Sequence, residues 1–192
     1  MMAEIHLHLD GIPNPDNITS DPELSKQLKD LFPVTTMEGF FKWGKIIDSK
    51  YAGNLNFLPP ILENHIISLR NQGAVYVEIM VSKSEMSKDY GVMTAEFEEL
   101  RHKTGLLENN EIQVEFIICL GRNKSPEFLA EQAERVLYLY NKGFICGVAL
   151  AGPEDGFPVK PFRNTFEKFK DNGIGIEIHA ASGQGRNLSG MP

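Results

Sequence analysis

Residues 4–11 of the chain read EIHLHLDG. Apolar side chains alternate with His6 and His8 before the run ends at an Asp-Gly pair, which predicts a β-strand closed by a turn. Residues two apart on a strand lie on the same face, so we expect both imidazoles on one face and the aliphatic side chains on the other. Two neighbouring imidazoles are suitable ligands for zinc. The alternative is a pair of solvated or hydrogen-bonded histidines on an edge strand.

Four further apolar runs predict strands, with helices between them. The predicted strands span residues 74–81, 112–120, 144–150 and 174–179, and the predicted helices span 20–32, 38–51, 57–72, 93–107, 126–141 and 161–172. Nearly continuous apolar strands, each followed by a helix, are typical of a parallel sheet in an α/β protein. No G-x-G-x-x-G motif follows a strand, so nothing local supports a dinucleotide-binding fold. We therefore expect part of a TIM-type (β/α) barrel, with about five of its eight strands.

Polar residues gather where the predicted strands end. They are His6, His8 and Asp10, then Glu78 and Ser82, Gly121 to Asn123, Gly152 to Asp155, and His179. In α/β folds the carboxyl ends of the strands hold the active site, so we expect the site there. Glu78 has two interpretations, a polar residue of the barrel interior or a hydrogen-bond partner of a ligand histidine.

Composition limits the possible partners. The 192 residues carry a net charge of -7 without a Lys/Arg cluster, which argues against binding to nucleic acid polymers or to an anionic membrane. No apolar run is long enough to span a membrane, and the N-terminus lacks the pattern of a signal peptide. Cys119 and Cys146 lie in apolar runs, and we expect reduced thiols in one soluble, cytoplasmic domain.

Four motifs together resemble the adenosine deaminase family of zinc hydrolases. They read AEIHLHLDG, VYVEIMVS, GVALAGPE and IEIHA, and the resemblance extends over residues 3–179. It implies a (β/α) barrel that converts adenosine to inosine and ammonia, by attack of a zinc-activated water on C6 of the purine. The implied partner is a small-molecule purine nucleoside, although adenine or another purine stays open.

The resemblance also implies roles for individual residues. His6, His8 and His179 match the three histidine ligands of the zinc ion. Asp10 matches the acidic residue that contacts the ribose, which favours a nucleoside over a free base. Gly152 matches the glycine whose backbone donates a hydrogen bond to the purine.

Departures from the family pattern predict an inactive chain. The family motif H-A-G-E supplies a glutamate that protonates the purine, whereas residues 179–182 read HAAS and place Ser182 there. A serine hydroxyl is too weak an acid for that step. The later His and Asp pair of the family would lie beyond residue 192, and Ala149 stands where the family often has Asp. We therefore expect an incomplete zinc site.

Residues 180–192 read AASGQGRNLSGMP and follow neither a helical nor a strand period, so we expect an irregular tail after a deaminase-like portion over 1–179. One hypothesis is translation out of frame, since a single inserted base in one permitted coding restores HAGEWAGPESVWDA. The alternative is a genuine short paralogue with a disordered tail.

Three functional hypotheses follow from these observations. The chain is the N-terminal portion of a deaminase, a non-catalytic metal- or nucleoside-binding remnant, or an interaction module. In the third case an open five-stranded sheet would self-associate through its exposed edges and its apolar interior.

Overall fold

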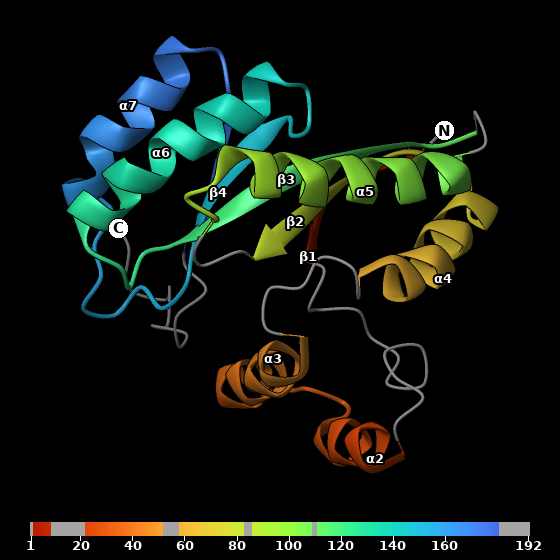
Figure 1. Cartoon of the computed structure of the whole chain (residues 1–192). Helices are drawn as coiled ribbons and strands as arrows, with labels where there is room; N and C mark the ends of the chain where they lie inside the picture. Colours follow the sequence, from red (N-terminus) through yellow and green to blue (C-terminus); the bar gives the residue numbers. More distant parts are fainter. Residues whose placement is uncertain (1, 9–21, 52–57, 83–85, 109–110, 181–192) are drawn as a thin grey trace, which may run out of the picture.

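The computed structural model describes residues 2–8, 22–51, 58–82, 86–108 and 111–180, and its centre is one parallel sheet (Figure 1). The sheet has the order β1-β2-β3-β4-β5, with every neighbouring pair parallel. The strands are β1 (Met2–His8), β2 (Ala74–Ser82), β3 (Gln113–Gly121), β4 (Gly147–Ala151) and β5 (Gly175–Ile178). Sequential order with parallel pairing confirms the predicted α/β architecture.

Helices connect the strands. They are α2 (Pro22–Leu31), α3 (Met37–Tyr51), α4 (Leu58–Asn71), α5 (Tyr90–Glu108), α6 (Pro126–Asn141) and α7 (Arg163–Asp171), with a short 3-10 helix η3 (Lys160–Phe162) before α7. Figure 1 shows α5, α6 and α7 along one side of the sheet, whereas α2 and α3 lie together away from these helices. None of the described helices is both long and apolar enough to span a membrane.

Both faces of the central strands are buried, which explains their nearly continuous apolar sequence. The outer face packs on the helices, and its core includes Val77, Ile79, Val114, Phe116, Ile118, Val148, Leu150, Phe97, Val136 and Phe169. The inner face has its own small cluster of Met80, Ile117, Cys119 and Ala149. Cys119 and Cys146 are free thiols, in agreement with the prediction.

The sheet is curled into a half-barrel. β1 and β5 are its two edges in strand order, yet His8 at the end of β1 lies 2.8 Å from His179, directly after β5. A flat sheet would separate these edges by four inter-strand spacings of nearly 5 Å each. Curling of the sheet therefore brings the carboxyl ends of the two edge strands, β1 and β5, close together.

Exposed apolar residues occur on the outer faces of the edge strands. Ile5 of β1 is 59% exposed and Ile178 of β5 is 45% exposed. The inner cluster, which we expected to be open to solvent, is buried. Among the described residues, these exposed apolar side chains of the edge strands thus lie on the outside of the half-barrel.

Two boundaries differ from the predicted ones because hydrogen-bonded caps at helix ends determine where the helix or the following strand begins. The strand expected from residue 144 begins at Gly147, because Phe144 takes part in the cap that follows α6 and donates its N–H to the Leu139 carbonyl. Gly143, at φ +74°, makes this Schellman motif possible. Helix α5 starts three residues earlier than expected because the Asp89 carboxylate accepts from the N–H groups of Gly91 and Val92.

Candidate metal centre

Three histidines converge at the carboxyl end of the sheet. Strand alternation places His6 and His8 on the inner face of β1, while Leu7 between them packs against the outer core. His179 follows β5, and its backbone N–H still donates to the Leu150 carbonyl, 3.0 Å away. The ring centroids are 4.9 to 5.1 Å apart, and one nitrogen from each ring lies within 4.8 Å of the other two.

The imidazole of His8 is neutral at physiological pH. Burial, with smaller contributions from the neighbouring His179 and His6 and against the opposing effect of Glu177, lowers its pKa to about 4. A neutral imidazole retains the lone pair that a metal ligand needs.

The orientation of His179 also suits a ligand. Its Nδ1 lies 3.2 Å from the Leu150 carbonyl oxygen, which can only accept, so the proton belongs on Nδ1 and the lone pair on Nε2. This Nε2 faces the Nε2 of His8 at 2.8 Å. Two nitrogens on a tetrahedral zinc at 2.0–2.1 Å would be about 3.3 Å apart, so a small opening of this pair accommodates the ion.

The donor set fits a catalytic zinc. Three imidazoles at the carboxyl end of the sheet resemble the histidine-rich coordination of catalytic zinc sites, which keep a further position for water or substrate. These side chains come from both edges of the sheet, so folding is needed to assemble them.

Arg122 connects the strand ends around this centre. Its backbone N–H donates to the Ala151 carbonyl at 2.8 Å, and its buried guanidinium donates through Nη2 to the carbonyl of His179. A Cβ on Gly152, at φ +105°, would lie 3.5 Å from Cγ of Arg122. In the sequence, Arg122 stands out only as one of the polar residues at a strand end, because its hydrogen-bond partners are distant in the chain.

Glu177 is a second residue that the sequence analysis missed. It lies on β5, and its carboxylate contacts Nδ1 of His6. The available signal was its position two residues before His179, which places both on one face of the strand.

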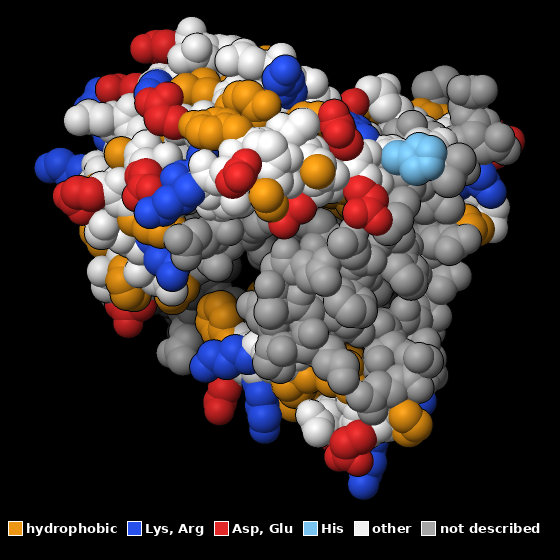
Figure 2. Space-filling view, in the orientation of Figure 1, with side chains coloured by type: hydrophobic (Ala, Val, Ile, Leu, Met, Phe, Trp, Pro, Cys, Tyr) orange, Lys and Arg blue, Asp and Glu red, His pale blue; other side chains and the backbone are white. Residues whose placement is uncertain are grey.

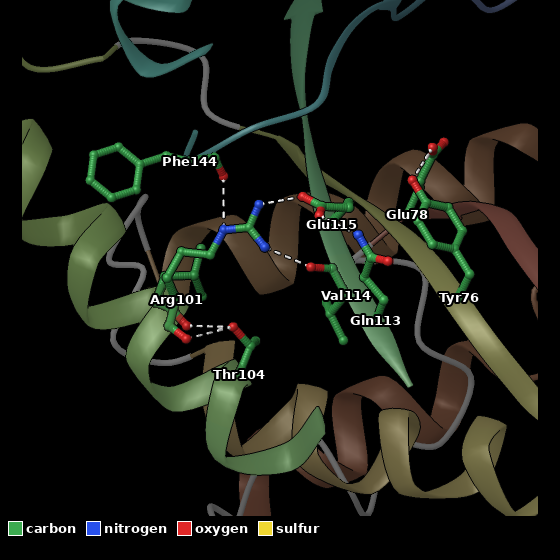
Figure 3. A network of polar contacts seen from close by, with 9 residues as sticks. Tyr76, Glu78, Arg101, Thr104, Gln113, Val114, Glu115 and Phe144 are labelled. Carbon is green, nitrogen blue, oxygen red and sulfur yellow. Dashed lines mark hydrogen bonds and ion pairs between the residues drawn. The ribbon is translucent and has the colours of Figure 1, made fainter. Parts of the chain in front are cut away.

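The other predicted residues have separate outcomes. Gly152 follows β4 beside Arg122, whereas Asp10 and Ser182 lie outside the described residues, as does the tail over 181–192. Glu78 accepts a hydrogen bond from the Tyr76 hydroxyl at 2.7 Å and belongs to a polar layer inside the sheet (Figure 3).

That polar layer lies toward the amino ends of the strands, away from the histidines. Figure 3 shows the guanidinium of Arg101, from α5, bonded to the carbonyls of Phe144 and Val114 and to the Glu115 carboxylate. Glu115 is the cross-strand neighbour of Glu78, so Arg101 offsets the repulsion between two adjacent carboxylates. The arrangement stabilises the amino-terminal end of the half-barrel.

The described surface has no extended basic area in the view of Figure 2, where acidic and basic side chains are interspersed. Several of them form exposed ion pairs, such as Arg163 with Glu167 and Lys168 with Glu134.

Comparison with known proteins finds relatives among purine deaminases. No family model matches the chain. An adenosine deaminase of Photorhabdus laumondii is 24% identical over 204 residues, which cover 96% of this chain and 59% of the relative. An adenine deaminase of Sinorhizobium fredii is 26% identical over 200 residues, which cover 93% of this chain and 56% of the relative. These relatives confirm the resemblance, and the chain spans less than two thirds of their length.

Solved structures share the fold. An adenine deaminase from Arthrobacter aurescens superposes with a TM-score of 0.70 at 17% identity, covering 93% of this chain and 57% of that one. Arabidopsis ADAL, complexed with GMP, gives a TM-score of 0.68 at 20% identity, with the same coverage. An amidohydrolase from Burkholderia ambifaria with bound Zn gives 0.58 at 11% identity, covering 93% of this chain and 51% of that one. The curled sheet therefore shares its fold with a little over half of each of these structures.

Proposed function

We propose that this chain, a relative of the adenosine and adenine deaminases with their α/β fold, uses His6, His8 and His179 to hold a zinc ion for hydrolytic deamination of a purine nucleoside. The observation that carries the proposal is the convergence of three imidazoles from opposite edges of the sheet. Water and adenosine would give inosine and ammonia.

Adenosine is the first substrate to test. Curated relatives include both adenosine and adenine deaminases, so the shared feature is a purine with an exocyclic amine. Asp10 matches the residue that contacts ribose in the adenosine deaminase family, which favours the nucleoside. Solved neighbours complexed with GMP and IMP support a purine in this fold.

The protein residues prepare the site for this chemistry. Zinc, when bound, lowers the pKa of water to about 7 and so supplies a nucleophile at neutral pH. His8 stays neutral through burial, and Arg122 and the Leu150 carbonyl hold His179 in place. The backbone N–H of Gly152 is the proposed donor to the purine ring.

Ser182 limits the rate in this proposal. It stands where the family has a glutamate that protonates the purine, and its hydroxyl is far less acidic. We therefore expect the 192-residue chain to bind zinc and nucleoside but to turn over adenosine slowly or not at all.

The test separates zinc binding from turnover. Zinc affinity is measured by competition with a chromophoric chelator for the full chain, for His8→Gln, and for His102→Gln as a control on the exposed side of α5. We expect one zinc per chain, lost in His8→Gln and retained in His102→Gln. Equal zinc affinity of the wild type and both variants would contradict the proposed zinc site.

Turnover is then measured by chromatography of adenosine and inosine after incubation with the zinc-loaded chain. Inosine formation at an enzymatic rate would overturn the role given to Ser182 and support an active deaminase. Nucleoside binding without inosine formation would support a binding protein.

The exposed edges support a further part of the proposal, self-association in the cytoplasm. The free thiols of Cys119 and Cys146 suit a reducing compartment. Ile5 and Ile178 expose apolar surface on the two edge strands, which invites pairing with another copy. Sedimentation of the full chain over a range of concentrations tests this, with Ile178→Lys expected to weaken association.

A further inference from the structure

We infer that Glu177 is a positioning residue of the metal centre, which orients His6 so that one defined nitrogen faces the ion. The inference rests on the proposed zinc site. It concerns a residue that lies within the IEIHA motif but to which the resemblance assigns no role.

The sheet places Glu177 on the inner face. Its cross-strand neighbour on β4 is Ala149, which belongs to the inner cluster and is fully buried. The methyl group of Ala149 occupies little space, so the longer Glu177 side chain can extend across the interior. It reaches the opposite edge of the sheet, where its carboxylate contacts Nδ1 of His6.

The contact selects a tautomer of His6. A carboxylate can only accept, so Nδ1 of His6 carries the proton and Nε2 retains the lone pair. A ligand histidine held through its other nitrogen by a carboxylate has both its tautomer and its ring orientation restrained.

His6 needs this restraint more than His179 does. The side chain of His6 is 45% exposed, so little packing restricts its rotation. His179 is held instead by the Leu150 carbonyl through Nδ1 and by Arg122 through its backbone. Each of these two histidines thus has its own acceptor at Nδ1, one from the backbone and one from Glu177.

The carboxylate also balances charge. Three imidazole ligands leave both positive charges of a zinc ion uncompensated, and the Glu177 carboxylate lies next to one of these ligands. The competing interpretation is an ordinary surface ion pair, which would have little effect on either stability or metal binding.

The experiment compares zinc affinities of full-length variants. Loss of an outer hydrogen-bond partner typically weakens metal binding by about 10- to 100-fold, and we expect this for Glu177→Ala. Glu177→Gln keeps an acceptor oxygen without the charge and should lie between Glu177→Ala and the wild type. Glu167→Gln removes an exposed ion pair with Arg163 and should match the wild type. Thermal melts establish that each variant is folded.

A second readout uses no metal. Long-range ¹H–¹⁵N spectra of the metal-free chain distinguish histidine tautomers, and we expect His6 as the Nδ1–H form in the wild type and as a mixture in Glu177→Ala. A merely structural role would leave the tautomer unchanged.

The outcomes separate this inference from the proposed function. Suppose that the wild type binds zinc, and that folded Glu177→Ala binds zinc equally well and has the same His6 tautomer. The role inferred for Glu177 is then wrong, whereas the proposed metal site is supported. If the wild type binds no zinc, the proposed site fails. The tautomer of His6 then decides whether Glu177 orients the ring.

Discussion

His8 and His179 face each other Nε2 to Nε2 at 2.8 Å, although 171 residues separate them in the chain. They belong to opposite edges of the described sheet, with β2, β3 and β4 between them. The contact exists because the sheet curls, so any change that flattens or loosens the sheet will disturb the candidate metal centre before it disturbs the outer core.

We expect acid to destabilise the metal-free chain through His8. Its pKa is about 4 in the folded state against 6.5 in the unfolded state, so the unfolded state binds more protons between these values. The stability is therefore highest above pH 6.5 and decreases progressively as the pH falls from 6.5 to about 4. The melting temperature of the chelator-treated chain should fall between pH 7 and pH 5. We expect this fall to be roughly 5 °C larger in the wild type than in His8→Gln. An equal difference in both proteins would contradict the assigned pKa.

Removal of Arg122 should affect both stability and the metal centre. Arg122→Ala loses the hydrogen bond to the His179 carbonyl and leaves a cavity where three strands end. A hydrogen bond from a charged group contributes about 1.5 to 3 kcal/mol, and we expect a loss of at least this size in urea unfolding. Zinc affinity should fall as well, since His179 loses a restraint. Arg163→Ala, at an exposed ion pair, is the matched control and should change neither quantity.

Disruption of the Arg101 network should destabilise the protein without changing the metal site. Arg101→Met leaves the half-buried Glu115 without its cation, beside Glu78 on the neighbouring strand. We expect a loss of about 2 kcal/mol in the free energy of unfolding, below the 3–5 kcal/mol of fully buried pairs because both side chains are partly exposed. The double variant Arg101→Met/Glu115→Gln should regain part of it. A large change in zinc affinity of the single variant would show that the two ends of the half-barrel are coupled.

Cys146 should react slowly with thiol reagents. Burial raises its pKa to about 11, so at pH 8 roughly one molecule in a thousand carries the reactive thiolate. We expect the folded chain to react with a disulfide reagent about 100-fold more slowly than the chain in denaturant, where the pKa is close to 8.5. Cys119, which is buried, should be at least as slow. Reaction at the denatured rate in the folded chain would contradict the burial of Cys146.

Local patterns predicted most of the elements. The alternation in residues 4–9 placed His6 and His8 on one face, and apolar runs predicted the other four strands within a few residues. Errors occurred where capping decided the boundary, as at Asp89 before α5 and at Phe144 after α6. Capping depends on individual hydrogen bonds, which hydrophobic periodicity does not report.

The amino-acid sequence by itself determined the alternation of strands and helices and the shared face of His6 and His8. It also carried the resemblance that indicates His179. Only the tertiary structure decided the curl of the sheet, the contact between Glu177 and His6, and the hydrogen bond from Arg122 to the His179 carbonyl. Periodicity is a property of neighbouring residues, whereas curvature and cross-sheet contacts arise from the pairing and packing of segments that are distant in the chain.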